Sequence, residues 1–289
     1  MLQIDGSPHD WFEGRAPVCT LLVFIDDATS RLMALRFVPA ETTQAYMDTL
    51  QMYLAQYGRP VAIYSDQHSI FRVNQQACAG ERTQFTRALE TLAIAPIHAH
   101  TPQAKGRVER AHQTLQDRLV KELRLHGFST LAAANAWLPT FQATYNRRFA
   151  VAPASPVDVH RPVLQAPQEL ARIFSLQHPR IISKHLCVHF QNCTYQLQGQ
   201  GRGYRLQGAP VTVREAFDGS IELLHEGRAL PYRLLTEGPA PIPVETEKML
   251  ALRLSTIQQA PRRRPRAKPA PAHPWRRPLR PPLAPPPAP

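Results

Sequence analysis

The sequence predicts an α/β protein with a mixed five-stranded sheet and flanking helices, followed by a small β-barrel domain and a disordered basic tail. Three observations predict this order. Apolar runs of strand length alternate with helical patterns over residues 1–150. Short strand patterns separated by glycines follow over residues 178–240, which is typical of small barrels. Residues 241–289 contain one helical pattern and then a stretch rich in proline and arginine.

The first 150 residues contain the strands of the sheet and the helices that cover it. We expect strands over residues 1–5, 18–26, 32–39, 61–66 and 95–100, and helices over 42–57, 83–92, 105–125 and 131–149. The second and third strands form a hairpin around the turn Asp27–Ser30. The order predicts a mixed sheet with this hairpin at one edge. Trp137, Phe141 and Tyr145 share a face of the last helix, where core packing is favoured over base stacking.

The composition changes twice further along the chain. Four prolines between residues 151 and 177 are typical of a linker. Beyond the linker we expect short strands over residues 186–190, 194–197, 204–206, 211–214 and 221–224, and a helix over residues 244–257. Residues 261–289 contain twelve prolines and few apolar residues, so they cannot build a core and are expected to be disordered.

Charge and composition indicate a soluble protein with a polyanionic partner. The formal net charge is +12 and the pI is about 10.1. Eight cations and no acid lie within residues 261–289, which leaves +4 for the rest of the chain. The four cysteines show no CxxC spacing, so free thiols are expected. The sequence contains neither 18 consecutive apolar residues nor a signal peptide, and we expect a cytoplasmic protein without a membrane span.

Three acidic residues stand out by their context. Asp5 and Asp66 each end an apolar strand pattern, and Glu109 lies where a long helical pattern begins. Any one of them alone reads as an ordinary turn or surface acid. Two carboxylates at strand ends and a third on a later helix can together hold two divalent ions, an arrangement suited to in-line displacement at phosphorus. Mg²⁺ suits such an oxygen-rich site, and Mn²⁺ is the alternative.

The sequence around these acids resembles the DDE integrase core of bacterial insertion-sequence transposases, particularly the ISNCY group. The matching stretches are QIDGSPHDWFE (Gln3–Glu13), FIDDATSR (Phe24–Arg31), YSD (Tyr64–Asp66) and PQAKGRVER (Pro102–Arg110). The resemblance extends over residues 1–163. It implies a ribonuclease-H-like fold, with Asp5 and Asp66 on neighbouring strands and Glu109 on a helix that faces them.

The resemblance also implies a function and its partners. It implies catalysis by Asp5, Asp66 and Glu109, with two Mg²⁺ or Mn²⁺ ions, of DNA strand cleavage and strand transfer. The partners would be double-stranded DNA, as transposon ends and target, and further copies of the chain assembled on it. Such transposases carry helix-turn-helix modules before the first catalytic strand, whereas four residues precede Asp5 here, so we expect an N-terminally truncated form. The alternative is a non-catalytic transposase remnant that binds DNA.

Several further residues are candidates with an open alternative. The cations Lys105, Arg107 and Arg110 surround Glu109 and either hold phosphates or are merely solvated. The tail adds four candidate DNA-binding residues: Arg262, Arg263, Arg264 and Arg266. The acids Asp10 and Glu13 either line the Asp5 cleft or lie outside it, and His68 either contacts DNA or has no role. Asp26 and Asp27 are assigned to the hairpin turn, and Asp117 lies too far along the helix to share a metal with Asp5.

Overall fold

The computed structural model describes residues 1–72, 82–99, 106–198, 203–236 and 251 of the 289. The predicted helix over residues 244–257, except for position 251, and the tail lie outside these residues. The same holds for Cys78 and Lys105. The other three cysteines, Cys19, Cys187 and Cys193, are free thiols, as predicted.

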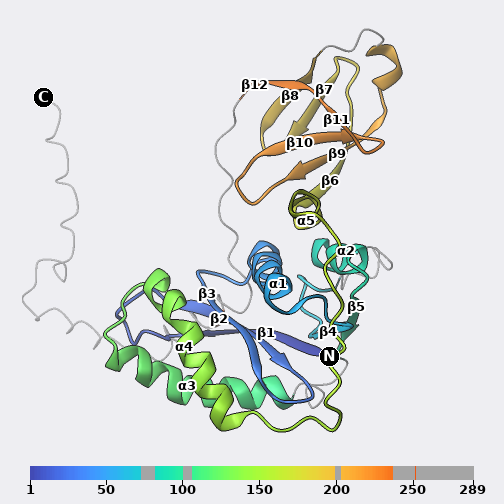
Figure 1. The fold of residues 1–289 in the computed structure, drawn as a ribbon. Helices are drawn as coiled ribbons and strands as arrows, with labels where there is room; N and C mark the ends of the chain where they lie inside the picture. Colours follow the sequence, from blue (N-terminus) through green and yellow to red (C-terminus); the bar gives the residue numbers. More distant parts are fainter. Residues whose placement is uncertain (73–81, 100–105, 199–202, 237–250, 252–289) are drawn as a thin grey trace, which may run out of the picture. The chain divides into compact units, whose positions relative to one another are not determined.

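A five-stranded mixed sheet forms the centre of the N-terminal part (Figure 1). Its strands are β1 (Leu2–His9), β2 (Cys19–Asp26), β3 (Leu32–Val38), β4 (Ala62–Ser65) and β5 (Ala95–His98). They lie in the order β3-β2-β1-β4-β5. β1, β2 and β3 pair antiparallel, whereas β1, β4 and β5 pair parallel. The predicted mixed sheet with an antiparallel hairpin at one edge is confirmed.

β1 continues past its predicted end at Asp5. It pairs with β2 along its whole length, from Leu2 opposite Asp26 to His9 opposite Cys19. The sequence Gly6-Ser7-Pro8 resembles a turn, and this is why the strand is underestimated from sequence. On its other side β1 pairs with β4 at Leu2 and Gln3. Pro8 lies beyond that pairing, so its missing N–H breaks no ladder with β4.

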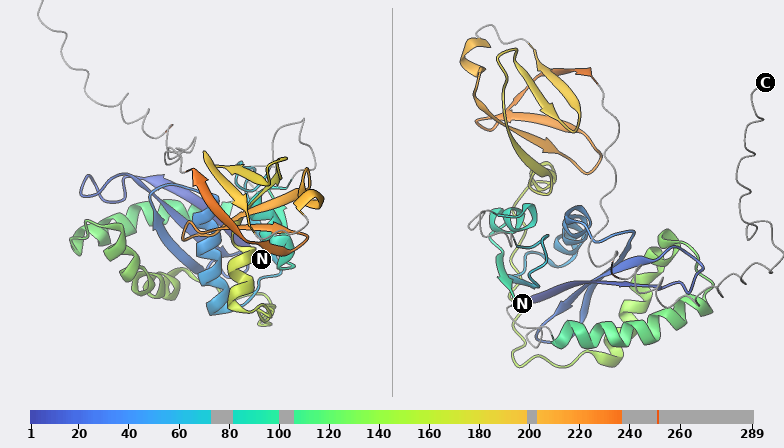
Figure 2. Two further views of the ribbon diagram at one scale, coloured as in Figure 1. Left: turned by 90° about the horizontal axis from the view of Figure 1, so that it is seen from above. Right: turned by 180° about the vertical axis from the view of Figure 1, so that it is seen from behind.

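Four helices cover the two faces of this sheet (Figure 2). They are α1 (Thr43–Tyr57), α2 (Gln84–Thr91), α3 (Gly106–Leu125) and α4 (Leu131–Phe149), close to the predicted bounds. Side chains of α1 and α2 pack with Leu2 and Ile4 in a first core. Side chains of α3 and α4 pack with Val23 and Ile25 in a second. β2 therefore reads as a continuous apolar run, because both of its faces are buried.

α4 covers the exposed edge of the sheet as well as one face. Phe141 and Tyr145 are buried and Trp137 packs partly against the second core, so the predicted core role of this aromatic stripe is confirmed. Asn135 exchanges two hydrogen bonds with the backbone of Phe37 in β3. Such side-chain contacts satisfy backbone groups that an edge strand would otherwise expose.

The proline-rich stretch after α4 contacts the sheet domain. The backbone N–H of Val151 donates to Thr29 O at 2.9 Å, and Arg161 pairs as an antiparallel bridge with Arg59. A short helix, α5 (Pro167–Ile173), follows where the sequence suggested only a linker. Pro167 occupies the first helical turn, where a missing N–H costs nothing. The side chains of Ile173 and Phe174 join the first core.

The C-terminal part is built of short antiparallel strands, as expected. β6 (Leu176–Ile181), β9 (Pro210–Glu215), β10 (Ile221–His225) and β11 (Arg228–Leu230) form one sheet, and β7 (Cys187–Phe190), β8 (Cys193–Leu197) and β12 (Tyr232–Thr236) form a second. Apolar side chains of both sheets share one core. Closure into a barrel stays a prediction.

One strand predicted in this part is wrong. Residues 204–206 belong to a 3₁₀ helix, η3 (Gly203–Leu206), and not to a strand. A pattern of three residues cannot separate a strand period of two from the three-residue period of a 3₁₀ turn. β6 extends two residues before the predicted start of the domain at 178. Pro179 is tolerated in β6 because that strand lies at the edge of its sheet.

Candidate functional site

Asp5 and Asp66 follow the parallel pairing of β1 with β4. Leu2 pairs with Ile63 and Gln3 with Tyr64. Asp5 lies two residues beyond this pairing in β1, and Asp66 lies two residues beyond it, directly after β4. Asp5 is 9% exposed, and Asp66 is half-buried.

The Asp5 side chain lies on the face of the sheet that α3 covers. Side chains alternate along a strand, so Asp5 and Ser7 share that face. The His112 Nδ1 atom of α3 lies 3.9 Å from Asp5 Oδ2, and the Gln116 side chain donates to Ser7 Oγ at 3.1 Å. The backbone N–H of Gly6 donates to Asp5 Oδ1 at 3.0 Å. The carboxylate is thus oriented by its own strand and faced by the helix that carries Glu109.

His112 and Gln116 are site neighbours that the sequence analysis missed. The signal was present in their spacing from Glu109, at i+3 and i+7, which places all three toward one side of a helix. Nothing in the sequence alone shows that this side of α3 meets β1 at Asp5.

The Asp66 carboxylate is oriented by the turn that follows β4. Its Oδ1 accepts from the backbone N–H of His68 at 2.9 Å. The Nδ1 atom of the His68 ring in turn accepts from the N–H of Ile70 at 3.4 Å. This contact gives His68 a structural role in the turn. Contact of its ring with DNA stays untested.

A buried tyrosine connects the two aspartates electrostatically. Tyr46 of α1 is fully buried, and its hydroxyl donates to Glu41 Oε1 at 2.8 Å. Burial first, and then the negative charges of Glu41, Asp5 and Asp66, raise the pKa of Tyr46 well above its ordinary value. Both carboxylates therefore contribute to this shift, after burial and Glu41.

Glu109 is exposed in the first turn of α3. Within the described parts of the chain, no three His, Cys, Asp or Glu side chains lie close enough together to hold a metal ion. The three predicted ligands are therefore not grouped in advance.

The cations near Glu109 differ in their surroundings. The Arg107 guanidinium lies 3.2 Å from Asp27 Oδ1 and donates to Ser30 Oγ, so it ties α3 to the β2–β3 turn. The side-chain amide of Gln3 donates to the same Asp27 oxygen at 2.7 Å. Arg110 is exposed to solvent. Lys105 and the tail residues Arg262, Arg263, Arg264 and Arg266 lie outside the described residues.

The remaining acids have contacts away from the pair of aspartates. Asp26 accepts from the backbone N–H and the hydroxyl of Thr29, which confirms its assignment to the hairpin turn. Glu13 forms an ion pair with Arg124 near the end of α3. Because Arg124 lies fifteen residues along α3 from Glu109, roughly 22 Å at 1.5 Å per residue, this ion pair lies far from Glu109. Asp117 pairs with Lys121 on the exposed side of α3.

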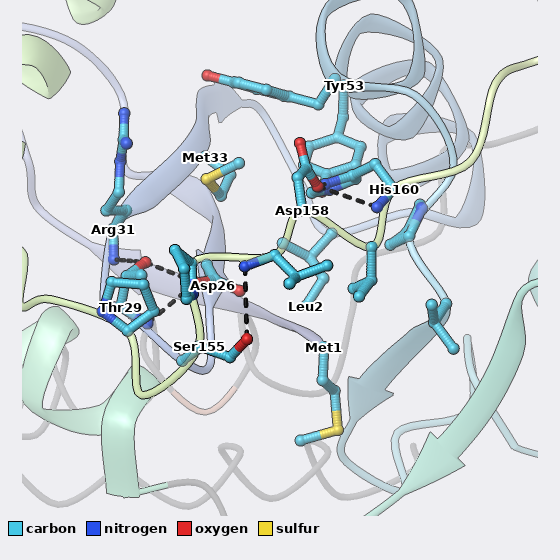
Figure 3. Close-up of a pocket in the computed structure, with 18 residues that line it drawn as sticks. Met1, Leu2, Asp26, Thr29, Arg31, Met33, Tyr53, Ser155, Asp158 and His160 are labelled. Carbon is cyan, nitrogen blue, oxygen red and sulfur yellow. Dashed lines mark hydrogen bonds and ion pairs between the residues drawn. The ribbon is translucent and has the colours of Figure 1, made fainter.

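A cavity of about 350 Å³ lies beside the β2–β3 turn (Figure 3). Leu2, Met33 and Tyr53 line it, together with the stretch from Pro153 to His160. The Tyr53 hydroxyl lies 2.5 Å from His160 Nε2, and His160 Nδ1 lies 2.6 Å from Asp158 Oδ1. This chain of contacts holds the proline-rich stretch against α1. None of Asp5, Asp66 and Glu109 lines the cavity.

The chain has relatives among bacterial transposases. It is 44% identical over 236 residues to "Putative transposase y4bF" of Sinorhizobium fredii, matching 81% of this chain and 52% of that protein. It is 34% identical over 231 residues to the transposase for insertion sequence IS1202 of Streptococcus pneumoniae, matching 77% and 48% respectively. No protein-family model matches the chain. Over about four fifths of its length the chain is therefore similar to bacterial transposases, one of them the transposase of an insertion sequence.

The chain spans about half the length of the curated relatives it matches. The solved structures that match the chain include retroviral integrases. The HTLV-2 integrase catalytic core domain, in complex with magnesium, matches 53% of this chain and 90% of its own, with 17% identity and a TM-score of 0.40. A chain of the simian T-cell lymphotropic virus intasome, in complex with PP2A regulatory subunit B56 gamma, matches 83% and 79%, with 17% identity and a TM-score of 0.41. None of the described helices is long and apolar enough to cross a membrane.

Proposed function

We propose that the chain is the catalytic part of a DDE-type transposase, a polynucleotidyl transferase of ribonuclease-H-like fold that cleaves and joins DNA strands. The observation that carries the proposal is the parallel pairing of β1 with β4, since β1 contains Asp5 and β4 ends directly before Asp66. Its substrates would be transposon ends and target DNA, bound in the cytoplasm by several copies of the chain.

The donor set fits divalent cations. Carboxylate oxygens are the ligands that Mg²⁺ and Mn²⁺ accept, and each aspartate already receives a backbone N–H on its Oδ1. Asp5 and Asp66 would bind two ions together with Glu109. When bound, such ions activate the attacking water or 3′-hydroxyl group and stabilise the leaving oxygen. The N–H groups of Gly6 and His68 would keep the two carboxylates in one orientation throughout.

Glu109 is proposed as the third ligand because of the way α3 packs against β1. His112, one turn further along the helix, faces Asp5. Glu109 therefore lies one helical turn before the residue that faces Asp5, and its side chain is flexible. The exposed Arg110 beside it would contact phosphates of the bound DNA.

A non-catalytic DNA-binding protein is the second candidate. It is favoured by the exposure of Glu109 and by the absence of a grouped set of three ligands among the described residues. The two candidates differ in what a metal does. A transposase needs the ions for chemistry, whereas a DNA-binding remnant retains its DNA affinity when they are removed.

The test uses the full chain with a duplex that carries the terminal repeat of its element, in Mg²⁺ and in Mn²⁺. We expect metal-dependent strand transfer that D5N, D66N and E109Q each reduce by at least about a thousandfold, because each removes a ligand charge from the reacting centre. D117N, on the same helix as Glu109 but paired with Lys121, is the matched control and should remain active. Full activity of E109Q would remove Glu109 from the site. DNA binding without any strand transfer would favour the second candidate.

A further inference from the structure

Gly6, which directly follows Asp5, has a carboxyl group packed where its side chain would be. A Cβ atom built on Gly6 would lie 2.7 Å from Glu41 Cδ and 2.8 and 2.9 Å from its two carboxyl oxygens. Real Cβ atoms essentially never show contacts below 3.0 Å, so either the Glu41 carboxyl group or the backbone at Gly6 would have to shift. The alternation along β1 places Gly6 on the face of Leu2 and Ile4, opposite to Asp5. Glu41 thus supports β1 from behind the candidate site.

Glu41 has little freedom to move away. It is 1% exposed, and its Oε1 accepts from the Tyr46 hydroxyl. Its backbone precedes Thr42, the N-cap of α1, whose hydroxyl accepts from the N–H of Ala45 at 3.1 Å. The start of the helix therefore holds the backbone of Glu41, and the Tyr46 ring holds its side chain.

A carboxyl group in this place is costlier to bury than a hydrocarbon side chain of the same size. That cost favours a role beyond filling space. The backbone N–H of Gly6 donates a hydrogen bond to Asp5 Oδ1. A shift of the Gly6 backbone would therefore also move the Asp5 carboxylate. Mg²⁺ accepts only narrow variation in ligand distance, on the order of 0.2 Å. A displacement of Gly6 by a few tenths of an ångström is then enough to disturb a metal ligand.

We infer that Glu41 is a positioning residue for Asp5: its carboxyl group, held by Tyr46, fixes the backbone at Gly6 and with it the metal-binding carboxylate. The inference rests on the proposed function. It assigns Glu41 a steric and hydrogen-bonding role and no contact with metal or DNA. The size of the side chain is therefore what matters, together with its acceptor for the Tyr46 hydroxyl.

Size-matched substitutions test this role, with Mn²⁺ binding to the full chain, without DNA, measured by calorimetry. G6A adds the methyl group that Glu41 excludes, and E41D withdraws the carboxyl group by one methylene. Each is expected to weaken Mn²⁺ binding by about tenfold or more, as for other groups that orient metal ligands. E41Q keeps size and acceptor and should bind within about threefold of the natural chain. The double substitution G6A/E41D places the new methyl group in the vacated space and should recover most of the lost affinity.

The controls separate positioning from folding and from the proposed function. T49V alters an equally buried polar group on α1, whose hydroxyl bonds Ala45 O, and should leave Mn²⁺ binding unchanged. Thermal unfolding of each variant identifies any that fail to fold, and E41D decides the matter if G6A does. Mn²⁺ binding that D5N abolishes but G6A and E41D leave intact overturns this inference alone. A natural chain that binds no Mn²⁺ through Asp5 overturns the proposed function as well.

Discussion

The two arginines that flank Glu109 in α3 have different surroundings and therefore different expected roles. Arg107 and Arg110 look equivalent in the sequence, since both flank Glu109 within a basic stretch. Their surroundings differ, because Arg107 contacts Asp27 and Ser30 whereas Arg110 is exposed. The guanidinium of Arg107 holds the start of the helix that carries Glu109. Its contribution to the site is then indirect, through the position of α3.

Substituting the two arginines separates these roles. We expect R107A to lower the free energy of unfolding by about 0.2–1 kcal/mol, the usual range for a partly exposed ion pair. R110A should leave stability unchanged and reduce the slope of log K against log salt for DNA binding by about 0.9, the effect of one phosphate contact. Chemical denaturation and salt titrations on duplex DNA measure the two effects. The reverse result, a salt-slope change in R107A alone, would reassign the phosphate contact to Arg107.

At the scale of elements, the sequence predicts most strands and helices because their patterns are long and their caps are clear. α1, α2 and α4 each begin after a threonine that accepts a backbone N–H. The errors fall where local pattern and tertiary pairing disagree. β1 runs on through Pro8 because β2 pairs with it, and α5 forms in a stretch whose prolines suggest a linker.

The candidate site divides in the same way. Asp5, Asp66 and Glu109 can be selected from sequence, because each has a strand end or a helix start beside it. Glu41 and His112 cannot, because their relation to Asp5 arises only when β1 packs between α1 and α3. A buried glutamate before a helix cap reads in the sequence as an ordinary exposed acid. Contacts between helices on opposite faces of a sheet and the strand between them leave no periodic pattern in the sequence, so they cannot be predicted from it.

In the C-terminal part, strand β6 contains a partly buried histidine, His178, whose protonation depends on pH. The ring of His178 packs on Phe190 at 4.8 Å between centroids, with Nε2 3.8 Å from Glu215 Oε2. Burial, together with the positive charge of Arg180, lowers the pKa of His178 below its ordinary 6.5, although Glu215 opposes the shift. The unfolded state then binds more protons than the folded state just below pH 6.5. The neutral His178 ring therefore contributes fully to the stability of the folded state above pH 6.5, and this contribution is lost as the pH falls below 6.5.

We therefore expect β6 and β9 to open more readily at pH 5.5 than at pH 7.5. H178F keeps an aromatic ring on Phe190 and removes the titrating group, so its opening should depend less on pH. The measurement is hydrogen exchange of residues 176–181 and 210–215, corrected for the intrinsic effect of pH. H185Q replaces an exposed histidine of the same domain and should behave as the natural chain. Equal pH dependence in H178F would assign the effect to another group.

On the scale of the whole molecule, most of the excess positive charge lies in the C-terminal stretch and not around the candidate catalytic site. The candidate site has a few cations around it, whereas eight of the chain's cations lie within residues 261–289, without a single acid. We predict that this stretch adds DNA affinity that is independent of sequence. The alternative is a solubilising extension with no binding role.

The tail is tested by comparing the full chain with one that ends at Ala260, on duplex DNA at several salt concentrations. Eight cations neutralise at most about eight phosphates, each adding about 0.9 to the slope of log K against log salt. Not all eight cations need contact phosphates at once, so the expected loss of slope is greater than zero and at most about seven. Because the contact is with phosphates, the loss should be the same for transposon-end and unrelated duplexes. Substituting Arg262, Arg263, Arg264 and Arg266 by glutamine in the full chain keeps its length and should reproduce about half of the effect. Equal affinity and equal salt slope with and without residues 261–289 would leave the tail without a role in binding DNA.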